Sequence, residues 1–417
     1  MFRRLLMPGA VALALASPLA WGATDADIAE IRNQLRDLKS DYEARIKGLE
    51  ERLKEAEARA AAAQTAPAPA PAATGTPSGG GLSNAFNPAM SAILTGTYAH
   101  LSQDPAHFSI PGFHPEGEVG PPRRSFGLGE SELTLSANVD PHFAGVLTFS
   151  ITPEDTVSVE EAYGQWTTAP YGLSPKFGRF LSGIGYLNEQ HAHAWDFVDA
   201  PLAYQAFLGG PYRNDGVQVK WLAPTEQYLA LGGEIGNGDA YPRSNRNANG
   251  AGSAAAYAHT GGDIGDSNSW RAGVSYLRAR SEDAFGATAD SKIGIADFIW
   301  KYSPHGNVRE TYAKVQGEYF SGRIRDAARQ SGWYLQGVYQ FLPEWRAGAR
   351  YDRVDPNGVD DATYASRKAS VMVDYNVSEF SRVRLQIARA QMQSDLTDNQ
   401  VFVQYILSLG AHGAHKY

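Results

Sequence analysis

The most chemically suggestive stretch of this sequence is "NEQHAHAWDF" at residues 188–197. His191 and His193 lie two positions apart there, with Glu189 and Asp196 close by. Neutral imidazole nitrogens bind transition metals, and carboxylates can add oxygen ligands. Two histidines do not complete the four-ligand set of a structural zinc site, so the first interpretation is that both imidazoles only hydrogen-bond within a packed loop. The alternative is a loose, exchangeable metal contact.

A second pair of histidines, His412 and His415, follows the last apolar stretch of the chain in "LGAHGAHKY". These residues are further candidate metal ligands, although we expect them at the opposite, periplasmic mouth from His191 and His193. Two separate histidine pairs along one passage could hand a cation onward.

The sequence holds no motif that specifies a reaction. The nucleophile elbow G-x-S-x-G, the phosphate-binding P-loop and the zinc-protease motif H-E-x-x-H are all absent. A lipid hydrolase with a Ser–His pair on the outer wall is the enzymatic alternative, but no stretch positions such a pair. We therefore expect a protein that is not an enzyme and has no resident cofactor, with zinc only as a transported ion.

The elements that must position these residues are short strands. From residue 82 to the end, apolar and polar side chains alternate over stretches of about ten residues that turn residues separate. In "WRAGARYDR", which begins at Trp345, every second side chain is apolar, while Arg346 and Arg350 share the other face. This alternation is typical of a membrane barrel, with one face toward lipid and the other toward a wet lumen. No apolar run after residue 22 is long enough for a transmembrane helix, so only a closed barrel could span a membrane.

Turn lengths decide the number of strands. Bacterial barrels have even strand numbers, short periplasmic turns and longer outer loops. The alternation alone gives about fifteen strands, and two of these, at 228–236 and 268–279, would both run outward. An inward strand must lie between them, and residues 253–263 are the candidate. The prediction is an all-β transmembrane barrel of about 16 antiparallel strands, at 92–101, 126–139, 142–152, 157–168, 173–181, 215–223, 228–236, 253–263, 268–279, 291–303, 309–321, 331–341, 345–354, 364–377, 381–393 and 399–409.

The first histidine pair falls in the longest predicted outer loop, residues 182–214. This segment is too apolar to be a freely solvated loop of its length. Trp195, Phe197, Tyr204 and Phe207 need a surface to pack on, and the inside of the barrel wall provides one. We therefore expect these four side chains in a constriction loop that narrows the pore. The loop could instead pack across the outer mouth or against a neighbouring subunit.

Charged side chains on the lumen faces of the strands are expected to line the pore. The basic members form a strip on strands that are neighbours in sequence, with acidic residues expected opposite them. A basic strip that faces acidic residues creates an electric field across the pore, which orients dipolar solutes and tunes the preference for ions. The alternative is mutual neutralisation of charges that only keep the pore wet. The predicted pore-lining residues are Glu130, Glu132, Lys314, Glu318, Arg346, Arg350, Arg382 and Arg384.

Residues 1–22 have the features of a signal peptide. Arg3 and Arg4 precede an apolar stretch, and the small residues Ala20 and Gly22 suit a cleavage site. An exported chain with no cysteine has no disulfide framework. The net charge of −8 and the lack of a basic arm argue against nucleic-acid binding. The expected location is the bacterial outer membrane.

Residues 23–63 are highly charged and carry apolar residues at heptad spacing from Ile28 onward. So narrow a stripe of apolar residues on a helix predicts a periplasmic α-helical coiled coil that pairs with copies of itself. The alternative is a single helix that docks on a partner. Residues 64–81 are rich in Pro and Ala and then in Gly, which predicts a linker. The barrel domain is therefore placed at residues 82–417.

Several stretches resemble the family of zinc-regulated outer-membrane receptors, most specifically over residues 179–210. The resemblance covers roughly residues 82–417 and extends more loosely to phosphate-selective porins. It implies a porin-like barrel made under zinc limitation and linked to zinc uptake, and the porin likeness implies an N-terminal coiled coil and a homotrimer. The matching stretches are "SNAFNPAMSAIL", "GLGESELTLSANVDPHFAG", "EEAYGQW", "GRFLSGIGYLNEQHAHAWDFVDAPLAYQAFLGG", "GVQVKWLAPT" and "FVQYILSLGAHGAHKY".

Together these observations predict an outer-membrane, porin-like channel for passive or facilitated diffusion of small hydrophilic solutes. Zinc or a small zinc chelate is the leading solute on the resemblance, while the residues alone support only a small hydrophilic solute. The expected partners are outer-membrane lipid and further copies of the chain. The alternative function is a structural tether, in which the N-terminal arm binds peptidoglycan and the barrel does not conduct.

Overall fold

The structure of the chain is a computed structural model. It describes residues 88–410 except for 117–118, 154–155, 239–240, 243–248 and 283–287. The predicted signal peptide, coiled coil and linker, and also His412 and His415, lie outside the described residues. Within the described ranges, no helix is both long enough and apolar enough to cross a bilayer.

The described chain consists mainly of β-strands joined by antiparallel ladders. Alternating sequences form such strands because successive side chains point to opposite faces. One α-helix, α2 (Leu202–Leu208), lies in the long connection between β6 and β7. Short 3-10 helices occur at Pro105–His107, Pro170–Gly172, Leu187–Glu189, Ala192–Ala194, Pro304–Gly306 and Val359–Asp361. The strands are β1 (Ala89–Leu101), β2 (Ser125–Leu128), β3 (Ser131–Asn138), β4 (Phe143–Ile151), β5 (Val157–Trp166), β6 (Leu173–Leu181), β7 (Arg213–Leu222), β8 (Tyr228–Gly236), β9 (Ser253–Ile264), β10 (Asn268–Glu282), β11 (Thr288–Tyr302), β12 (Tyr312–Arg323), β13 (Gln330–Leu342), β14 (Trp345–Asp355), β15 (Ser366–Ser378), β16 (Ser381–Gln391) and β17 (Thr397–Gly410).

The sheet closes on itself at β1. One edge of β1 pairs with β17, and the other edge pairs first with β2, where Tyr98 is opposite Phe126, and then with β3. β2 and β3 are therefore two segments of one wall strand. The 17 segments form a closed antiparallel barrel of 16 strands, which confirms the predicted barrel. The strand inferred from turn lengths at 253–263 is β9.

The wall strand predicted at 126–139 is not continuous. It is interrupted at Gly129 and Glu130, between β2 and β3. There the N–H of Gly129 donates to the carbonyl of Thr95 at 2.8 Å, and the hydroxyl of Ser131 accepts from the N–H of Thr95 at 3.1 Å. A side-chain hydroxyl thus replaces a backbone acceptor for one step of the ladder, so the predicted wall strand has a break that the sequence did not indicate.

Side chains alternate between a buried polar face and an exposed apolar face. In β16, Leu385 and Ile387 are 44% and 51% exposed, while Arg384 and Gln386 are buried. The same contrast repeats along most strands of the wall. So extensive a surface of exposed aliphatic and aromatic side chains suits hydrocarbon rather than water. The outward face is therefore the face that lipid would cover.

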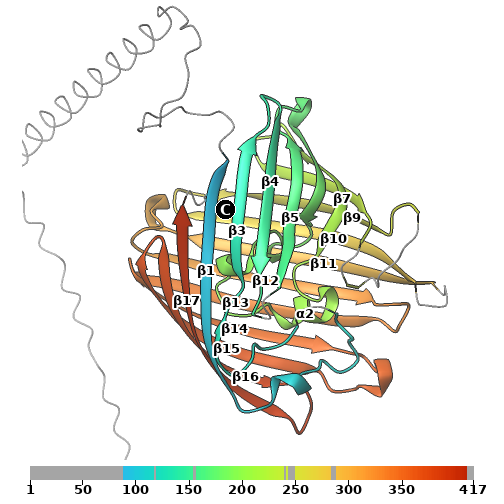
Figure 1. Cartoon of the computed structure of the whole chain (residues 1–417), viewed down its shortest axis with the longest axis vertical. Helices are drawn as coiled ribbons and strands as arrows, with labels where there is room; N and C mark the ends of the chain where they lie inside the picture. The colour runs from blue at the N-terminus through green and yellow to red at the C-terminus, as the bar shows by residue number, and fades with distance from the viewer. Residues whose placement is uncertain are drawn as a thin grey trace, which may run out of the picture. The chain divides into compact units, whose positions relative to one another are not determined.

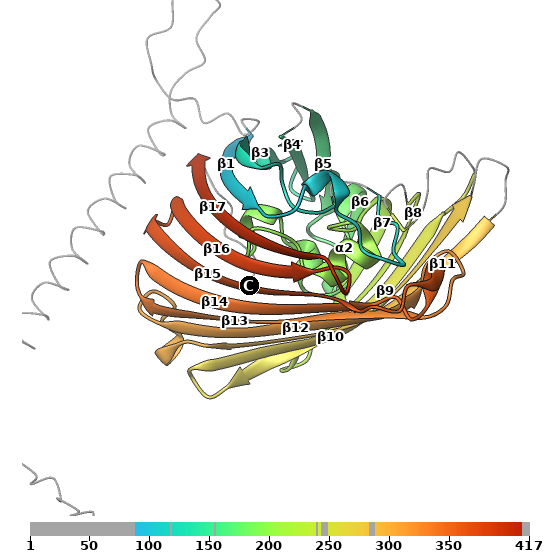
Figure 2. The same cartoon turned by 90° about the horizontal axis from the view of Figure 1, so that it is seen from below.

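The two ends of the barrel differ in the length of their connections. Short turns, such as residues 343–344 and 379–380, lie at the end where β1 begins and β17 ends. We define this as the short-turn end and the opposite one as the long-loop end, which in bacterial barrels faces the outside. Figures 1 and 2 show α2 inside the ring of strands, and all seven of its residues are buried.

Candidate metal site inside the barrel

The connection at residues 182–212, which we define as the inserted loop, folds into the barrel. Its amide groups bond to carboxylates on the wall. The N–H of Gly183 donates to Glu234 at 2.8 Å, and the N–H of Leu202 donates to Asp352 at 3.0 Å. Buried backbone groups need such partners. Of the three placements considered for this loop, the structure shows the inward one.

Glu318, one of the residues expected to line the pore, holds the inserted loop. Its carboxylate accepts from the N–H groups of Tyr186 and Leu187 at 3.1 and 3.0 Å. It also accepts from the hydroxyls of Tyr204 and Tyr334 at 2.9 and 2.7 Å. A buried carboxylate with four donors is a fixed anchor, because moving any one of them leaves polar groups unsatisfied.

The four aromatic residues expected in the constriction are buried, and they pack the inserted loop against its surroundings. The ring of Phe207 lies 5.7 Å from that of Phe320 on β12 and 5.2 Å from that of Phe113, which belongs to the connection after β1. Burying each such side chain contributes about 1.5–3 kcal/mol. The loop is therefore held by packing as well as by hydrogen bonds. The four residues are Trp195, Phe197, Tyr204 and Phe207.

His191 and His193 meet three glutamates of the wall. Nδ1 of His191 lies 3.2 Å from Oε2 of Glu132 and 3.1 Å from Oε2 of Glu160. Its Nε2 lies 3.1 Å from Oε2 of Glu161. Nδ1 of His193 lies 2.7 Å from Oε1 of Glu132. We define these five residues as the acidic cluster.

Glu160 and Glu161 are neighbours in β5, yet both are buried. A regular strand would turn one of them outward. The pairing of β4 with β5 shifts by one residue here, since Phe149 is opposite Val159 and Thr148 is opposite Glu161. Glu160 is thus the extra residue of a β-bulge, a feature that re-aims side chains beside many functional sites. Sequence reasoning missed both glutamates, although two adjacent acids in an alternating strand were a usable signal.

Three atoms of the acidic cluster converge as metal ligands do. Nδ1 of His191 and one oxygen from each of Glu132 and Glu160 all lie within 4.8 Å of one another. Ligand atoms around a tetrahedral zinc with bonds of about 2.0–2.1 Å are roughly 3.3 Å apart, close to the 3.1 and 3.2 Å found here. Among the described residues, neither this Nδ1 nor Oε2 of Glu160 has a hydrogen-bond partner of regular geometry. A cation between them would satisfy both atoms.

The same carboxylates also favour a proton on His191. Burial alone would lower the pKa of His191, but the adjacent Glu132, Glu160 and Glu161 raise it well above its usual value. The imidazolium and a divalent cation therefore compete for the same oxygens, and metal binding releases a proton. About a fifth of the side chain, 21%, is exposed. The cluster suits an exchangeable cation better than a permanently enclosed one.

The other two predicted ligands of the inserted loop do not join the acidic cluster. Glu189 forms an ion pair with Lys220 on β7. Burial raises the pKa of Glu189, but Lys220 outweighs it and lowers the value to about 2. Asp196 pairs with Lys314 at 2.5 Å and with Arg346 at 3.0 Å. Fixed side-chain cations thus occupy the positions beside both carboxylates.

The inserted loop meets a basic wall on its other side. Asp199 pairs with Arg350 at 3.1 Å and with Lys368 at 2.8 Å. Burial would raise the pKa of Asp199, but Lys368 and Arg350 hold it far below its usual range. Arg384 donates to the carbonyl of Trp195 at 2.9 Å. We define the basic cluster as Asp196, Asp199, Lys314, Arg346, Arg350, Lys368 and Arg384.

Two further residues expected to line the pore, Glu130 and Arg382, belong to neither cluster, although Asp374 beside Arg382 also pairs with Arg346 and Arg384 of the basic cluster. Glu130 accepts a hydrogen bond from Ser150 at 2.6 Å. Arg382 lies near the short-turn end, 3.8 Å from Asp374. Asp199 and Lys368 were missed in the sequence, because one aspartate in a loop and one lysine in a strand carry no distinctive pattern. Their roles follow only from the path of the inserted loop.

The sequence has a recognisable relative, although no protein-family model matches it. A protein of Aquifex aeolicus (strain VF5), described only as uncharacterized, is 31% identical over 390 residues. The match covers 80% of this chain and 80% of the relative.

Solved structures with a similar fold are outer-membrane proteins. The anion-selective porin from Comamonas acidovorans has a TM-score of 0.53 at 10% identity, covering 77% of this chain and 99% of the porin. The outer-membrane channel DcaP of Acinetobacter baumannii has a TM-score of 0.52 at 11% identity, covering 77% and 96%. OmpT of Vibrio cholerae in its trimer form has a TM-score of 0.50 at 14% identity, covering 77% and 98%. At these identities the likeness shows a shared fold, the porin-like barrel.

Proposed function

This chain belongs to the same family as the Aquifex aeolicus protein, and we propose that it is a porin-like channel of the bacterial outer membrane for small hydrophilic solutes. The proposed preferred solute is zinc or a small zinc chelate. One observation carries the proposal. The inserted loop brings His191 from inside the barrel into a group of three wall glutamates. The barrel supplies the passage, and the acidic cluster supplies a preference for a divalent cation.

The donor set favours a metal of the zinc type. An imidazole nitrogen suits zinc, copper, iron and nickel, whereas sites for magnesium and calcium are built from oxygens alone. The acidic cluster offers one imidazole nitrogen and two carboxylate oxygens at converging positions. Three protein ligands leave the fourth position of a tetrahedral ion open to water or to a chelating group. The resemblance to zinc-regulated receptors adds zinc as the specific choice.

Facilitated diffusion needs an ion site that releases its ion. Conduction requires binding that is favourable enough for entry and weak enough for exit. Competition from the His191 proton and the partial exposure of this side chain both weaken retention. The acidic cluster therefore suits a transient ion-binding site within the channel.

We also propose that the barrel assembles as a homotrimer, with its outward apolar face in lipid and its N-terminal arm in the periplasm. The similarly folded OmpT of Vibrio cholerae was solved in a trimer form, which supports this stoichiometry. Light scattering of the detergent-solubilised protein tests it, and a monomeric mass contradicts it.

Zinc entry into liposomes tests the channel proposal. Purified protein is reconstituted with a zinc-sensitive dye inside the vesicles, and influx is compared between the wild type and the double variant His191→Ala/His193→Ala. We expect zinc influx to fall about tenfold or more, as for the loss of metal-orienting groups elsewhere, while the flux of a neutral sugar of similar size is unchanged. His305→Ala is the matched control, because His305 is exposed and pairs with Asp266 at the short-turn end. Equal zinc influx in all variants sinks the zinc assignment.

One observation favours the alternative function, a tether between the outer membrane and peptidoglycan. The inserted loop and a large apolar core occupy part of the barrel interior. Planar-bilayer recording separates the two functions. Stepwise openings support a channel, and a persistent absence of current from folded protein supports a non-conducting anchor.

A further inference from the structure

Cations on the outward face of the barrel form a row at the long-loop end. Arg278 on β10 is directly opposite Lys292 on β11. Lys292 is in turn directly opposite Arg323 on β12. Arg323 is the last residue of β12, and Arg329 is the last residue of the connection from β12 to β13. All four side chains are exposed.

The row continues on the next strands, where Arg353 of β14 is directly opposite Arg367 of β15. Like charges that face each other across adjacent strands destabilise a sheet. An external anion that binds beside such pairs would relieve this repulsion. The arrangement also disfavours a second copy of the chain on this face, because two such rows would repel each other.

Carboxylates of the chain neutralise this row only in part. Asp290 pairs with Arg278 at 2.6 Å, and Asp355 lies 3.7 Å from Arg353. Among the residues whose side chains the structure describes, no carboxylate forms an ion pair with Lys292, Arg323 or Arg329. We define these three residues as the basic triad. The triad therefore presents three positive charges to whatever surrounds the barrel at this height.

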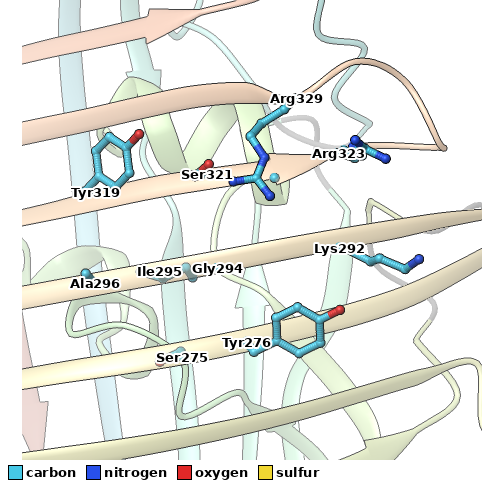
Figure 3. Close-up of a pocket in the computed structure, with 11 residues that line it drawn as sticks. Ser275, Tyr276, Lys292, Gly294, Ile295, Ala296, Tyr319, Ser321, Arg323 and Arg329 are labelled. Carbon is cyan, nitrogen blue, oxygen red and sulfur yellow. The ribbon is translucent and has the colours of Figure 1, made fainter.

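A groove of about 640 Å³ lies on the outward face next to the basic triad. Figure 3 shows Tyr276 and Tyr319 on either side of the strand that carries Gly294 and Ala296, with the triad gathered toward one end. The small residues make a shallow floor, and the two rings, each 49% exposed, form its sides. Exposed tyrosines of this kind mark the boundary between hydrocarbon and headgroups. The groove thus has an apolar trough and a cationic end at headgroup height.

We propose that this groove binds a phosphorylated glycolipid of the outer leaflet, with a phosphate on the basic triad and the adjoining acyl chain in the trough. Arg and Lys are the usual partners of phosphate oxygens. The long-loop end places the triad in the outer leaflet, where the lipid phosphates are carried on sugar headgroups. Free phosphate would use the triad but not the trough. The proposal depends on the outer-membrane location and not on the passage of zinc.

Lipid retention by the purified, full-length protein tests the proposal. Folded protein in detergent is incubated with bisphosphorylated lipid A, and bound lipid is counted by native mass spectrometry. We expect the variant Lys292→Gln/Arg323→Gln/Arg329→Gln to bind on the order of 100-fold more weakly, since each basic residue near an anionic headgroup contributes a factor of about five. Arg309→Gln is the matched control, because Arg309 is exposed in the turn at the opposite end.

A second variant separates a lipid from a free phosphate. Gly294→Leu fills the trough without changing any charge, and its Cβ would meet its nearest neighbour, Ser321, at an ordinary 3.7 Å. We expect it to weaken lipid A binding, and we expect dephosphorylated lipid A to bind poorly to the wild type. Equal binding of inorganic phosphate and lipid A, or no effect of Gly294→Leu, overturns the glycolipid assignment.

Two further outcomes keep the test decisive. If the triple variant fails to fold, wild-type retention is measured at about 0.1 M and about 1 M NaCl, since screening weakens phosphate contacts. Retention that does not respond to salt overturns the role of the basic triad. A change in oligomeric mass without a change in bound lipid shows that this face contacts a second copy, and it also overturns the proposal.

Discussion

The acidic and basic clusters are built from one short segment of the inserted loop, residues 191–199, and they treat charge in opposite ways. In the acidic cluster, three wall carboxylates surround two histidines, and the central His191 keeps 21% of its side chain exposed. In the basic cluster, each loop aspartate has two side-chain cations, and both aspartates are 9% exposed or less. One side has excess ligands for a cation, and on the other side both aspartates are already paired with cations.

This difference separates a binding region from a holding region. A buried aspartate that is paired with two cations cannot exchange partners without leaving an uncompensated charge, which costs several kcal/mol. A cluster whose cation is a proton can exchange it for a metal ion. The inserted loop is thus held in place by its aspartates, while its histidines can exchange a proton for a metal ion.

The largest expected effect is on the holding side. Asp199→Ala leaves Lys368 buried without a carboxylate partner among the described residues, while Arg350 keeps Asp352 at 2.9 Å. We expect it to lower the free energy of unfolding by about 3–5 kcal/mol. Denaturant unfolding in detergent measures this loss. Asp360→Ala is the control, since Asp360 is exposed and its pair with His114 should contribute only about 0–1 kcal/mol. Equal losses of unfolding free energy for both variants would contradict the assignment of Asp199 to the holding side.

The next effect concerns the binding side. His191→Ala removes the nitrogen ligand of the converging set, and we expect zinc affinity to fall on the order of 100-fold, the upper range seen even for groups that only orient ligands. His193→Ala removes a group that positions Glu132, and a loss of about tenfold follows. Isothermal titration with zinc measures both. A larger loss for His193 than for His191 contradicts the assigned roles.

A third prediction uses pH to distinguish the two sides. Because the pKa of His191 is raised in the folded chain, the stability it adds is fully present below its unfolded value of about 6.5 and is lost as pH rises through the folded value. Below that raised pKa each zinc ion displaces one proton, so zinc affinity should rise about tenfold per pH unit. Titrations between about pH 6 and pH 8 measure this slope, which His191→Ala should flatten.

The basic cluster has the opposite pH response. The pKa of Asp199 is lowered, so the stability from this carboxylate is present above its unfolded value of about 3.9 and is lost only as pH falls through the folded value. Asp199 therefore contributes constantly over the range in which His191 titrates. A steep change between about pH 6 and pH 8 in the destabilisation caused by Asp199→Ala contradicts this assignment.

The smallest effect is expected at Glu189, which the sequence placed among the ligands. Because Glu189 pairs with Lys220 instead of joining the acidic cluster, Glu189→Gln should change zinc affinity by less than about threefold, the scale of a partly exposed ion pair. A tenfold loss would show that Glu189 moves to the metal when an ion binds.

The strands could be predicted because their signal is local. Alternation fixes which face each side chain takes, and β8 lies at Tyr228–Gly236, the range the pattern indicated. The interruption at Gly129 and the bulge at Glu160 escaped prediction because each depends on a neighbouring strand. A bulge inverts the alternation for one residue, so a pattern with a period of two misassigns the faces there.

The barrel and the character of the inserted loop follow from the order of residues along the chain. Alternation over the strands, the apolar residues of the loop, and the order of two histidines followed by two aspartates are all properties of neighbouring residues. The partners of these side chains depend on the folded barrel, because His193 meets a glutamate 61 positions away and Asp199 meets a lysine 169 positions away. Side-chain chemistry is carried by each residue, but the number of ligands that converge on one point is set by where closure of the barrel brings distant strands together.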